Sequence, residues 1–186
     1  MDLPPTGGPA GLWSNVEEVE FAREAGREVP LVMVRVERDG AGWRALPVDP
    51  FGQPTGPARP VLVRHGAPVV GDAALRRARP FRCWAAIPRR DGSWWGARDL
   101  ELHDQGGMTR LTTDETPPQA FELKMRNVVW PSGPNRPSLV LYVHEPGAPR
   151  ALAYAWADPG AVRVGLNLRR VQASCTLAGA EGTPPP

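Results

Sequence analysis

The strongest constraint on the fold is a series of short runs in which apolar and polar residues alternate, separated by turns rich in proline and glycine. The 23 prolines and 20 glycines among 186 residues are too many for a protein of long helices. Alternation with a period of two is typical of a strand that buries one face. Because such runs follow one another along most of the chain, the sequence predicts an all-β fold.

The clearest alternation lies in residues 151–157. Leu152, Tyr154 and Trp156 share one face of that run, and the residues between them are alanines. A face of large side chains opposite a face of small ones is typical of a closely packed sheet or a tapering barrel. We therefore expect Trp156 to be a structural residue.

The succession of about nine or ten short strands predicts an antiparallel barrel, with a β-sandwich as the alternative. One short helix is expected at residues 71–78, where Asp72 is a candidate N-cap. Residues 15–27 favour a strand, or a short helical turn that runs into one. No glycine-rich loop joins a strand to a helix, which excludes a Rossmann or P-loop fold.

The length bounds the number of domains. A chain of 186 residues is long enough for one domain with a proper core and short for two ordinary ones. We expect a single domain over residues 11–177. Residues 1–10 and 178–186 consist mainly of small residues and proline, and they are expected to be flexible tails.

Composition and charge limit the classes of partner. The net charge is +2, and acidic residues are interleaved with the arginines. We expect no nucleic acid partner, because such binding requires a clustered basic stripe. The N-terminus lacks a leader pattern and no segment reaches the length of a membrane span, so we expect a cytoplasmic protein without a membrane partner. Self-association into a homodimer stays open.

Neither cysteine belongs to a recognisable motif. Cys83 and Cys175 lie far apart without a CxxC spacing, which excludes the common zinc and redox motifs. In a reducing compartment we expect two buried thiols that act as small apolar groups, and whether the two cysteines are paired stays open. The three histidines fall on different predicted strands, and we expect neither a metal nor another cofactor.

Tryptophans gather in residues 80–111, the stretch that carries most of the candidate chemistry. Three of them flank a predicted turn at residues 91–92, so this hairpin is the expected wall or mouth of a cavity. An arginine would hold an acidic group of the ligand. The candidate ligand-binding residues are Trp84, Trp94, Trp95, Met125, Arg126 and Tyr154.

His103 and Asp104 are the candidate catalytic residues. A carboxylate beside an imidazole can hold the ring in one tautomer, so that the ring acts as a general base. Neighbours on a strand point to opposite faces, however, and these two side chains could meet only if the chain turns there. In the alternative, Asp104 opens a turn and His103 is exposed or hydrogen-bonded elsewhere.

Gly11-Leu12-Trp13 stands just before the first extended segment, where it resembles the GxW signature that opens lipocalins and related calycin barrels. The resemblance implies that Trp13 closes the floor of a barrel. It also implies that the Trp13 ring packs near an arginine of a late strand, a role that Arg163 or Arg169 could fill.

A second likeness is to the CpcT/CpeT-type chromophore lyases, calycin-like barrels that attach bilins to phycobiliproteins. Residues 11–15 (GLWSN), 80–82 (PFR) and the extended run at 100–104 look like the opening and the P-Y-R strand of that family. Glu18 and Val19 stand where the family has Gln-Ala, and its glutamate-glutamine-alanine-tyrosine stretch is absent. The likeness therefore implies a barrel more than an activity.

These observations favour a barrel that binds a small apolar or aromatic molecule, a pigment or a metabolite, in its interior. One alternative is a cofactor-independent barrel enzyme, such as a lyase, isomerase or cyclase, in which His103 and Asp104 transfer a proton. Another is a β-sandwich that contacts a protein partner through exposed tryptophans and proline-rich loops. A filled interior would favour this last alternative.

Overall fold

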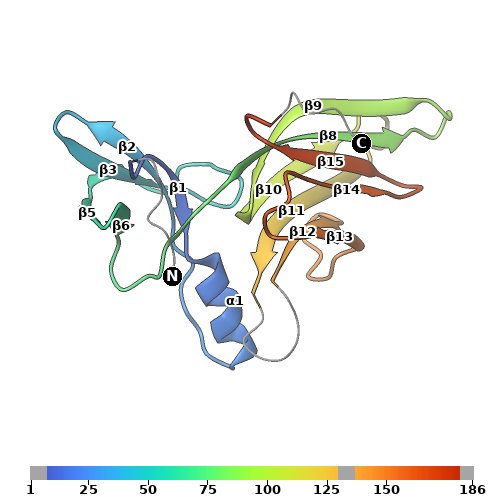
Figure 1. Ribbon diagram of the computed structural model, residues 1–186. Coiled ribbons are helices and arrows are strands. Elements are labelled where there is room, and N and C mark those ends of the chain that lie inside the picture. The colour runs from blue at the N-terminus through green and yellow to red at the C-terminus, as the bar shows by residue number, and fades with distance from the viewer. Residues whose placement is uncertain (1–7, 130–136, 181–186) are drawn as a thin grey trace. The chain divides into compact units, whose positions relative to one another are not determined.

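The computed structural model describes residues 8–129 and 137–180, which divide into two compact units (Figure 1). Unit 1 is the part of the chain up to Ala78, and unit 2 begins at Arg79. Each unit has a hydrophobic core of its own. The single domain expected over residues 11–177 stays a prediction, and most of both expected tails lies outside the described residues.

Unit 1 is an antiparallel sheet with the strand order β4-β3-β2-β1-β7, together with the hairpin β5-β6 and one helix. Its core is formed by Trp13, Val34, Val36 and Ala45. The indole nitrogen of Trp13 donates a hydrogen bond to the carbonyl of Pro9 at 2.8 Å, which anchors the residues before β1. The elements are β1 Gly11–Ser14, α1 Val16–Glu24, β2 Met33–Asp39, β3 Gly42–Pro47, β4 Arg59–Pro60, β5 Leu62–Arg64, β6 Ala67–Val69 and β7 Arg76–Arg77.

The helix α1 corrects the preference for a strand at residues 15–27. Glutamates at positions 17 and 18 occupy its first turn, where the positive end of the helix dipole stabilises acidic side chains. Phe21, which alternates with charged neighbours as a strand residue would, is 41% exposed. The alternation in this segment therefore did not mark a buried strand face.

The helix expected at residues 71–78 is also corrected. This segment contains turns and the two-residue strand β7, in which Arg76 and Arg77 pair with β1. Gly71 has a φ of +54°, a left-handed conformation that does not occur inside a right-handed helix. Pairing with the free edge of β1 satisfies the backbone of β7 in place of helical hydrogen bonds.

Unit 2 consists of two four-stranded antiparallel sheets, with the orders β14-β15-β8-β9 and β10-β11-β12-β13 (Figure 1). Every neighbouring pair in both sheets is antiparallel. The strands are β8 Pro80–Pro88, β9 Trp94–His103, β10 Gln105–Thr112, β11 Ala120–Val128, β12 Ser138–His144, β13 Ala153–Ala157, β14 Arg163–Asn167 and β15 Gln172–Leu177.

The eight strands of unit 2 follow one another around the core in sequence order, and β15 returns to pair with β8. The pairs β9/β10 and β13/β14 are in contact but belong to different sheets. In the described part of the chain the ladder is thus interrupted at two places, and no closed barrel is found. The all-β prediction is confirmed at the level of antiparallel sheets.

One core fills the space between the two sheets of unit 2. Both sheets contribute inward-facing side chains, and the largest that are fully buried include Phe81, Phe121, Ile87 and Leu141. On β13 the alanines face this core, while Trp156 on the opposite face is 69% exposed. The expectation that Trp156 is structural is therefore wrong, because the small side chains are the ones that fit between the sheets.

A disulfide joins Cys83 of β8 to Cys175 of β15 inside this core. The two residues are directly opposite in the β8/β15 register, with a Cα–Cα distance of 4.0 Å. Both side chains point inward and are buried. The prediction of two separate thiols is therefore wrong, because a separation of 92 residues along the chain becomes a direct cross-strand contact.

In the described residues, no helix has both the length and the apolar character that crossing a membrane requires.

Candidate functional site

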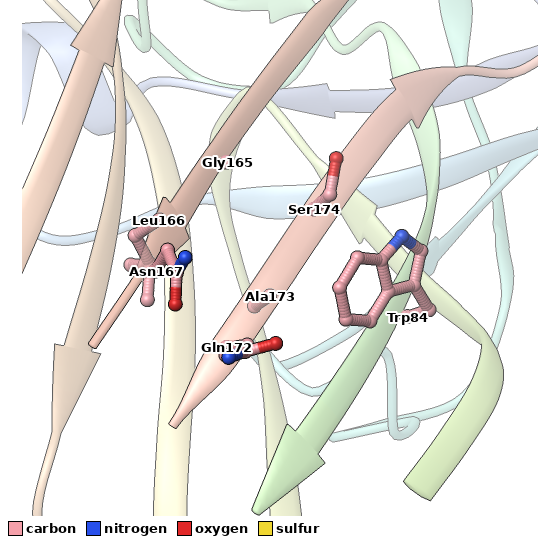
Figure 2. A pocket seen from close by; sticks show the side chains of 7 residues that line it. All are labelled: Trp84, Gly165, Leu166, Asn167, Gln172, Ala173 and Ser174. Atoms are coloured by element: carbon pink, nitrogen blue, oxygen red, sulfur yellow. The ribbon is translucent and has the colours of Figure 1, made fainter. Parts of the chain in front are cut away.

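A groove lies on the outer face of the β14-β15-β8 sheet, beside the indole ring of Trp84 (Figure 2). Three residues form a row across it, because Trp84 of β8 pairs with Ser174 of β15, and Ser174 pairs with Gly165 of β14. Trp84 is 45% exposed, whereas its two neighbours on the strand, Cys83 and Ala85, are buried in the core. The strand alternation therefore directs this large apolar ring outward.

Gly165 keeps the groove open opposite Trp84. A Cβ atom at this position would lie 2.9 Å from the carbonyl oxygen of Ala173 and 3.1 Å from the Cβ of Ser174. Any larger residue would therefore have to move the backbone of the neighbouring strand. It would also fill the groove between β14 and the Trp84 ring.

Polar side chains line the rest of the groove. Asn167 is exposed, and Gln172 and Ser174 are half-buried. Within the described residues, no hydrogen bond is found for the amides of Asn167 and Gln172 or for the hydroxyl of Ser174. Because amides and hydroxyls both donate and accept, these groups can hold the polar edge of a ligand.

The groove has a volume of about 340 Å³, near the lower end of the roughly 300–1,000 Å³ that ligand pockets occupy. None of the seven described residues that line it carries a formal charge. The side chains of the remaining two residues, Leu166 and Ala173, pack toward the core of unit 2, and Ala173 is 1% exposed. The site therefore combines one flat aromatic wall with neutral hydrogen-bonding groups.

The other residues expected to bind a ligand lie elsewhere. Trp94 is 51% exposed on β9, and Trp95 packs against the core of unit 2. Met125 is fully buried in that core. Arg126 and Tyr154 lie on the outer face of the other sheet. Of the six candidates, only Trp84 lines the groove.

Sequence reasoning missed the polar residues of the groove, Asn167, Gln172 and Ser174. Asn167 belongs to the polar face of an alternating run, which is the ordinary solvent-facing side of a strand. The signal that identifies the site is the cross-strand pairing of β8, β15 and β14. That pairing has no counterpart in the linear sequence.

Asp104 takes part in a buried network and is 1% exposed. Its carboxylate accepts hydrogen bonds from the backbone nitrogen of Arg79 at 2.8 Å, from Arg79 Nε at 2.6 Å and from Asn127 Nδ2 at 3.2 Å. These contacts occupy both oxygens and join the start of β8, the β9–β10 turn and the end of β11. Asp104 is therefore an anchor between strands.

His103 packs over Gly107 at the same turn. A Cβ atom on Gly107 would lie 2.7 Å from the Cδ2 atom of His103, so the ring occupies the space that a side chain at position 107 would need. This contact gives the imidazole a packing role where the chain passes from one sheet to the other.

The turn at residues 91–92 is held by a surface network. The backbone nitrogen of Arg90 donates to Glu115 Oε1 at 2.8 Å, and Arg89 forms an ion pair with Asp114 at 2.8 Å. The hydrogen bond from Arg90, followed by that from the Gln119 amide, lowers the pKa of Glu115. The hydroxyl and then the backbone nitrogen of Ser93 lower the pKa of Asp91. The expected wall of a cavity is thus tied to the loop between β10 and β11.

The candidate for the barrel floor, Trp13, is in the core of unit 1. Arg163 lies on the exposed side of β14, where its Nε donates to Thr176 Oγ1 at 3.3 Å. The contact of Trp13 with Arg163 or Arg169 that the calycin resemblance implies stays a prediction.

The described residues hold no group of three or more histidine, cysteine, aspartate or glutamate side chains placed to bind a metal ion. Comparison of the chain with protein-family models, with curated proteins and with solved structures finds no match.

Proposed function

We propose that unit 2 is a binding module that takes a small neutral sugar, or a short neutral oligosaccharide, in the groove beside Trp84. The observation that carries the proposal is an exposed indole face next to three neutral polar side chains without partners among the described residues. The proposal keeps the expectation of a small-molecule ligand and moves it from the interior to the outer face.

The chemistry of a sugar ring fits both parts of this groove. One face of a pyranose is a patch of C–H groups, which the negative face of an aromatic ring attracts. The rim of the sugar carries hydroxyls, each a donor and an acceptor. The amides of Asn167 and Gln172 and the hydroxyl of Ser174 offer matching groups beside the indole ring.

The filled interior of unit 2 supports a ligand site on its outer face. Met125 and the other inward-facing side chains form one buried cluster, and the disulfide runs through it. The strand order, with β15 returning to β8, resembles that of an up-and-down barrel. We therefore also propose that unit 2 is a flattened relative of the calycin barrels, with its ligand on the surface.

The test is calorimetric titration of the whole chain with neutral gluco-, xylo- and manno-oligosaccharides, followed by titration of Trp84→Ala. Loss of the indole face should weaken binding about tenfold or more, since burial of an aromatic ring contributes about 1.5–3 kcal/mol. Trp84→Phe should retain part of the affinity, because a smaller aromatic face remains.

Trp94→Ala is the matched control, because Trp94 is similarly exposed on the neighbouring strand and does not line the groove. It should leave sugar affinity unchanged. Equal losses in both variants, or no binding of any neutral oligosaccharide at millimolar concentration, would contradict the proposal.

A further inference from the structure

A second hollow lies within unit 1. Three segments line it: the first turn of α1 with the residue before it, the residues that precede β2, and the turns that follow β6. Its volume is about 440 Å³, which is within the roughly 300–1,000 Å³ that ligand pockets occupy. Because every lining residue that the structure describes belongs to unit 1, this hollow is separate from the groove beside Trp84.

The walls of this hollow are mainly hydrocarbon. Their apolar side chains are those of Val29, Pro30, Val32, Val70 and Ala73. Val32 and Val70 also pack against the core of unit 1, which holds them in place. The hollow therefore offers a short aliphatic group an apolar surface on which to leave water.

Hydrogen bonds fix the carboxylate of Glu18 at the side of this hollow. Its Oε2 atom accepts from Asn15 Nδ2 at 3.2 Å and from the backbone nitrogen of Ala74 at 3.0 Å. Asn15 is 1% exposed, and its side chain also donates to the carbonyl of Pro30 and accepts from the backbone nitrogen of Val32. Both hydrogen bonds found for Glu18 in the described part of the chain reach Oε2, so Oε1 is available to a ligand.

The charge of Glu18 has no cationic partner among the described residues, in contrast to the glutamates beside it on α1. Glu17 forms an ion pair with Arg76 at 4.0 Å, and Glu20 forms one with Arg23 at 3.0 Å. The hydrogen bonds of Glu18 come from neutral amide groups only. A glutamate carries a negative charge at neutral pH. A positively charged ligand would therefore supply the partner that Glu18 lacks.

Asp72 adds a second negative charge at the rim of this hollow. Its side chain is exposed, and no hydrogen bond or ion pair joins it to another described residue. A Cβ atom on the preceding Gly71 would meet no atom within 4 Å other than those of its chain neighbours, so the rim is open here. No lysine, arginine or histidine is among the lining residues in the described ranges, and Arg23 and Arg27 line a different hollow.

We propose that this hollow binds a small primary amine, whose ammonium group lies at Glu18 Oε1 and Asp72 and whose hydrocarbon chain lies against Val32 and Val70. The three N–H donors of a primary ammonium match carboxylate oxygens, and hydrogen bonds between charged groups are the strong ones. This site does not depend on the function proposed for the groove beside Trp84.

The lining favours a primary amine over other cations. Quaternary ammonium groups have no N–H donor and are recognised by aromatic cages, whereas no aromatic residue is among those described as lining this hollow. A calcium ion takes six to eight oxygen ligands. Glu18 and Asp72 are the two carboxylates here, and the apolar walls offer no further side-chain oxygen.

The experiment is an NMR titration of the whole, isotope-labelled chain with n-pentylamine at neutral pH. The amide resonances of Gly71 and Ala74 should shift with saturation, because both residues lie at the proposed ammonium site. From propylamine to pentylamine, each added CH₂ should tighten binding by up to about fourfold as more hydrocarbon leaves water. Pentanol, which has the same chain without the charge, should bind at least about tenfold more weakly.

Two variants test the carboxylates. Glu18→Gln should weaken pentylamine binding about tenfold, since it removes the charge and leaves an oxygen that can still accept from Asn15 and Ala74. Asp72→Asn should weaken it about threefold, because an exposed ion pair contributes less. Glu17→Gln is the matched control: Glu17 lies in the same helical turn but does not line the hollow, so affinity should not change.

Several results would overturn the proposal. They are equal binding of pentanol, tighter binding of Ca²⁺ or of Nα-acetyl-lysine amide, and unchanged affinity in both Glu18→Gln and Asp72→Asn. Circular dichroism checks that the variants fold. If Glu18→Gln does not, Asp72→Asn and the chain-length series decide, because Asp72 is exposed. Trp84→Ala should leave pentylamine binding unchanged, so the amine site and the sugar site fail independently.

Discussion

Asp104 shows how burial and hydrogen bonding assign a role to a single residue. The sequence offers a histidine and an aspartate side by side, a combination that occurs in proton-transfer sites. In the structure the carboxylate is buried and bound by Arg79 and Asn127. A group whose oxygens already accept these hydrogen bonds stabilises the fold at the point where three strands meet.

Replacement of Asp104 by asparagine should therefore lower the free energy of unfolding by about 2–3 kcal/mol, since it removes charged hydrogen bonds with Arg79. Chemical denaturation measures the change. Asp99→Asn is the control on the same hairpin, because Asp99 is 83% exposed and its ion pair with Arg82 spans 3.9 Å. The control should change stability by less than about 0.5 kcal/mol. Equal losses in the two variants would argue against an anchoring role.

At the scale of elements, the β8–β9 hairpin depends on carboxylates at its tip. The Arg90 amide binds Glu115 from the neighbouring loop, and the Ser93 amide binds Asp91. The lowered pKa values of Glu115 and Asp91 mean that folding favours their ionised forms. This contribution to stability is present at neutral pH and is lost as the pH falls through the lowered pKa values.

We expect the hairpin tip to loosen below about pH 4 while the core strands stay protected. Amide hydrogen exchange, expressed as protection relative to the unfolded chain, should show the Arg90 and Ser93 amides losing protection together. In Glu115→Gln, the Arg90 amide should lose its pH dependence and the Ser93 amide should keep it. Protection of both amides that stays constant down to pH 3 would contradict this assignment.

At the scale of the whole molecule, the disulfide connects the first and last strands of unit 2. It closes the sequence of strands at the β8/β15 pair, where the chain separation is 92 residues. A cross-link over so long a loop restricts the unfolded chain strongly. Such bonds persist mainly in oxidising compartments, and the cytoplasmic location stays a prediction.

Removal of the cross-link in Cys83→Ala/Cys175→Ala should destabilise the protein by about 2–4 kcal/mol. Thermal and chemical unfolding measure the loss, and a thiol assay in denaturant without reductant should find both thiols absent in the parent. The single variant Cys83→Ala should lose about as much, because either change breaks the bond. Two titratable thiols in the unreduced parent would contradict the disulfide.

The sequence by itself determined the all-β class and the positions of most strands of unit 2. The alternating run at 151–157 contains β13, and the predicted turn at residues 91–92 lies between β8 and β9. These features are local, because an alternating pattern and the turns that bound it lie within a few residues. The local pattern gave a wrong prediction at α1, where the alternation of Val19 and Phe21 favoured a strand but the segment is a helix and Phe21 is exposed.

The tertiary structure alone decided which faces are buried and which residues meet. Alternation shows that the two faces of β13 differ, but the narrow space between the sheets admits the alanines and turns Trp156 outward. The disulfide and the row from Trp84 through Ser174 to Gly165 arise from strand pairing between distant segments. Such pairing depends on how every strand packs on the common core, and this information is not contained in any single stretch of the chain.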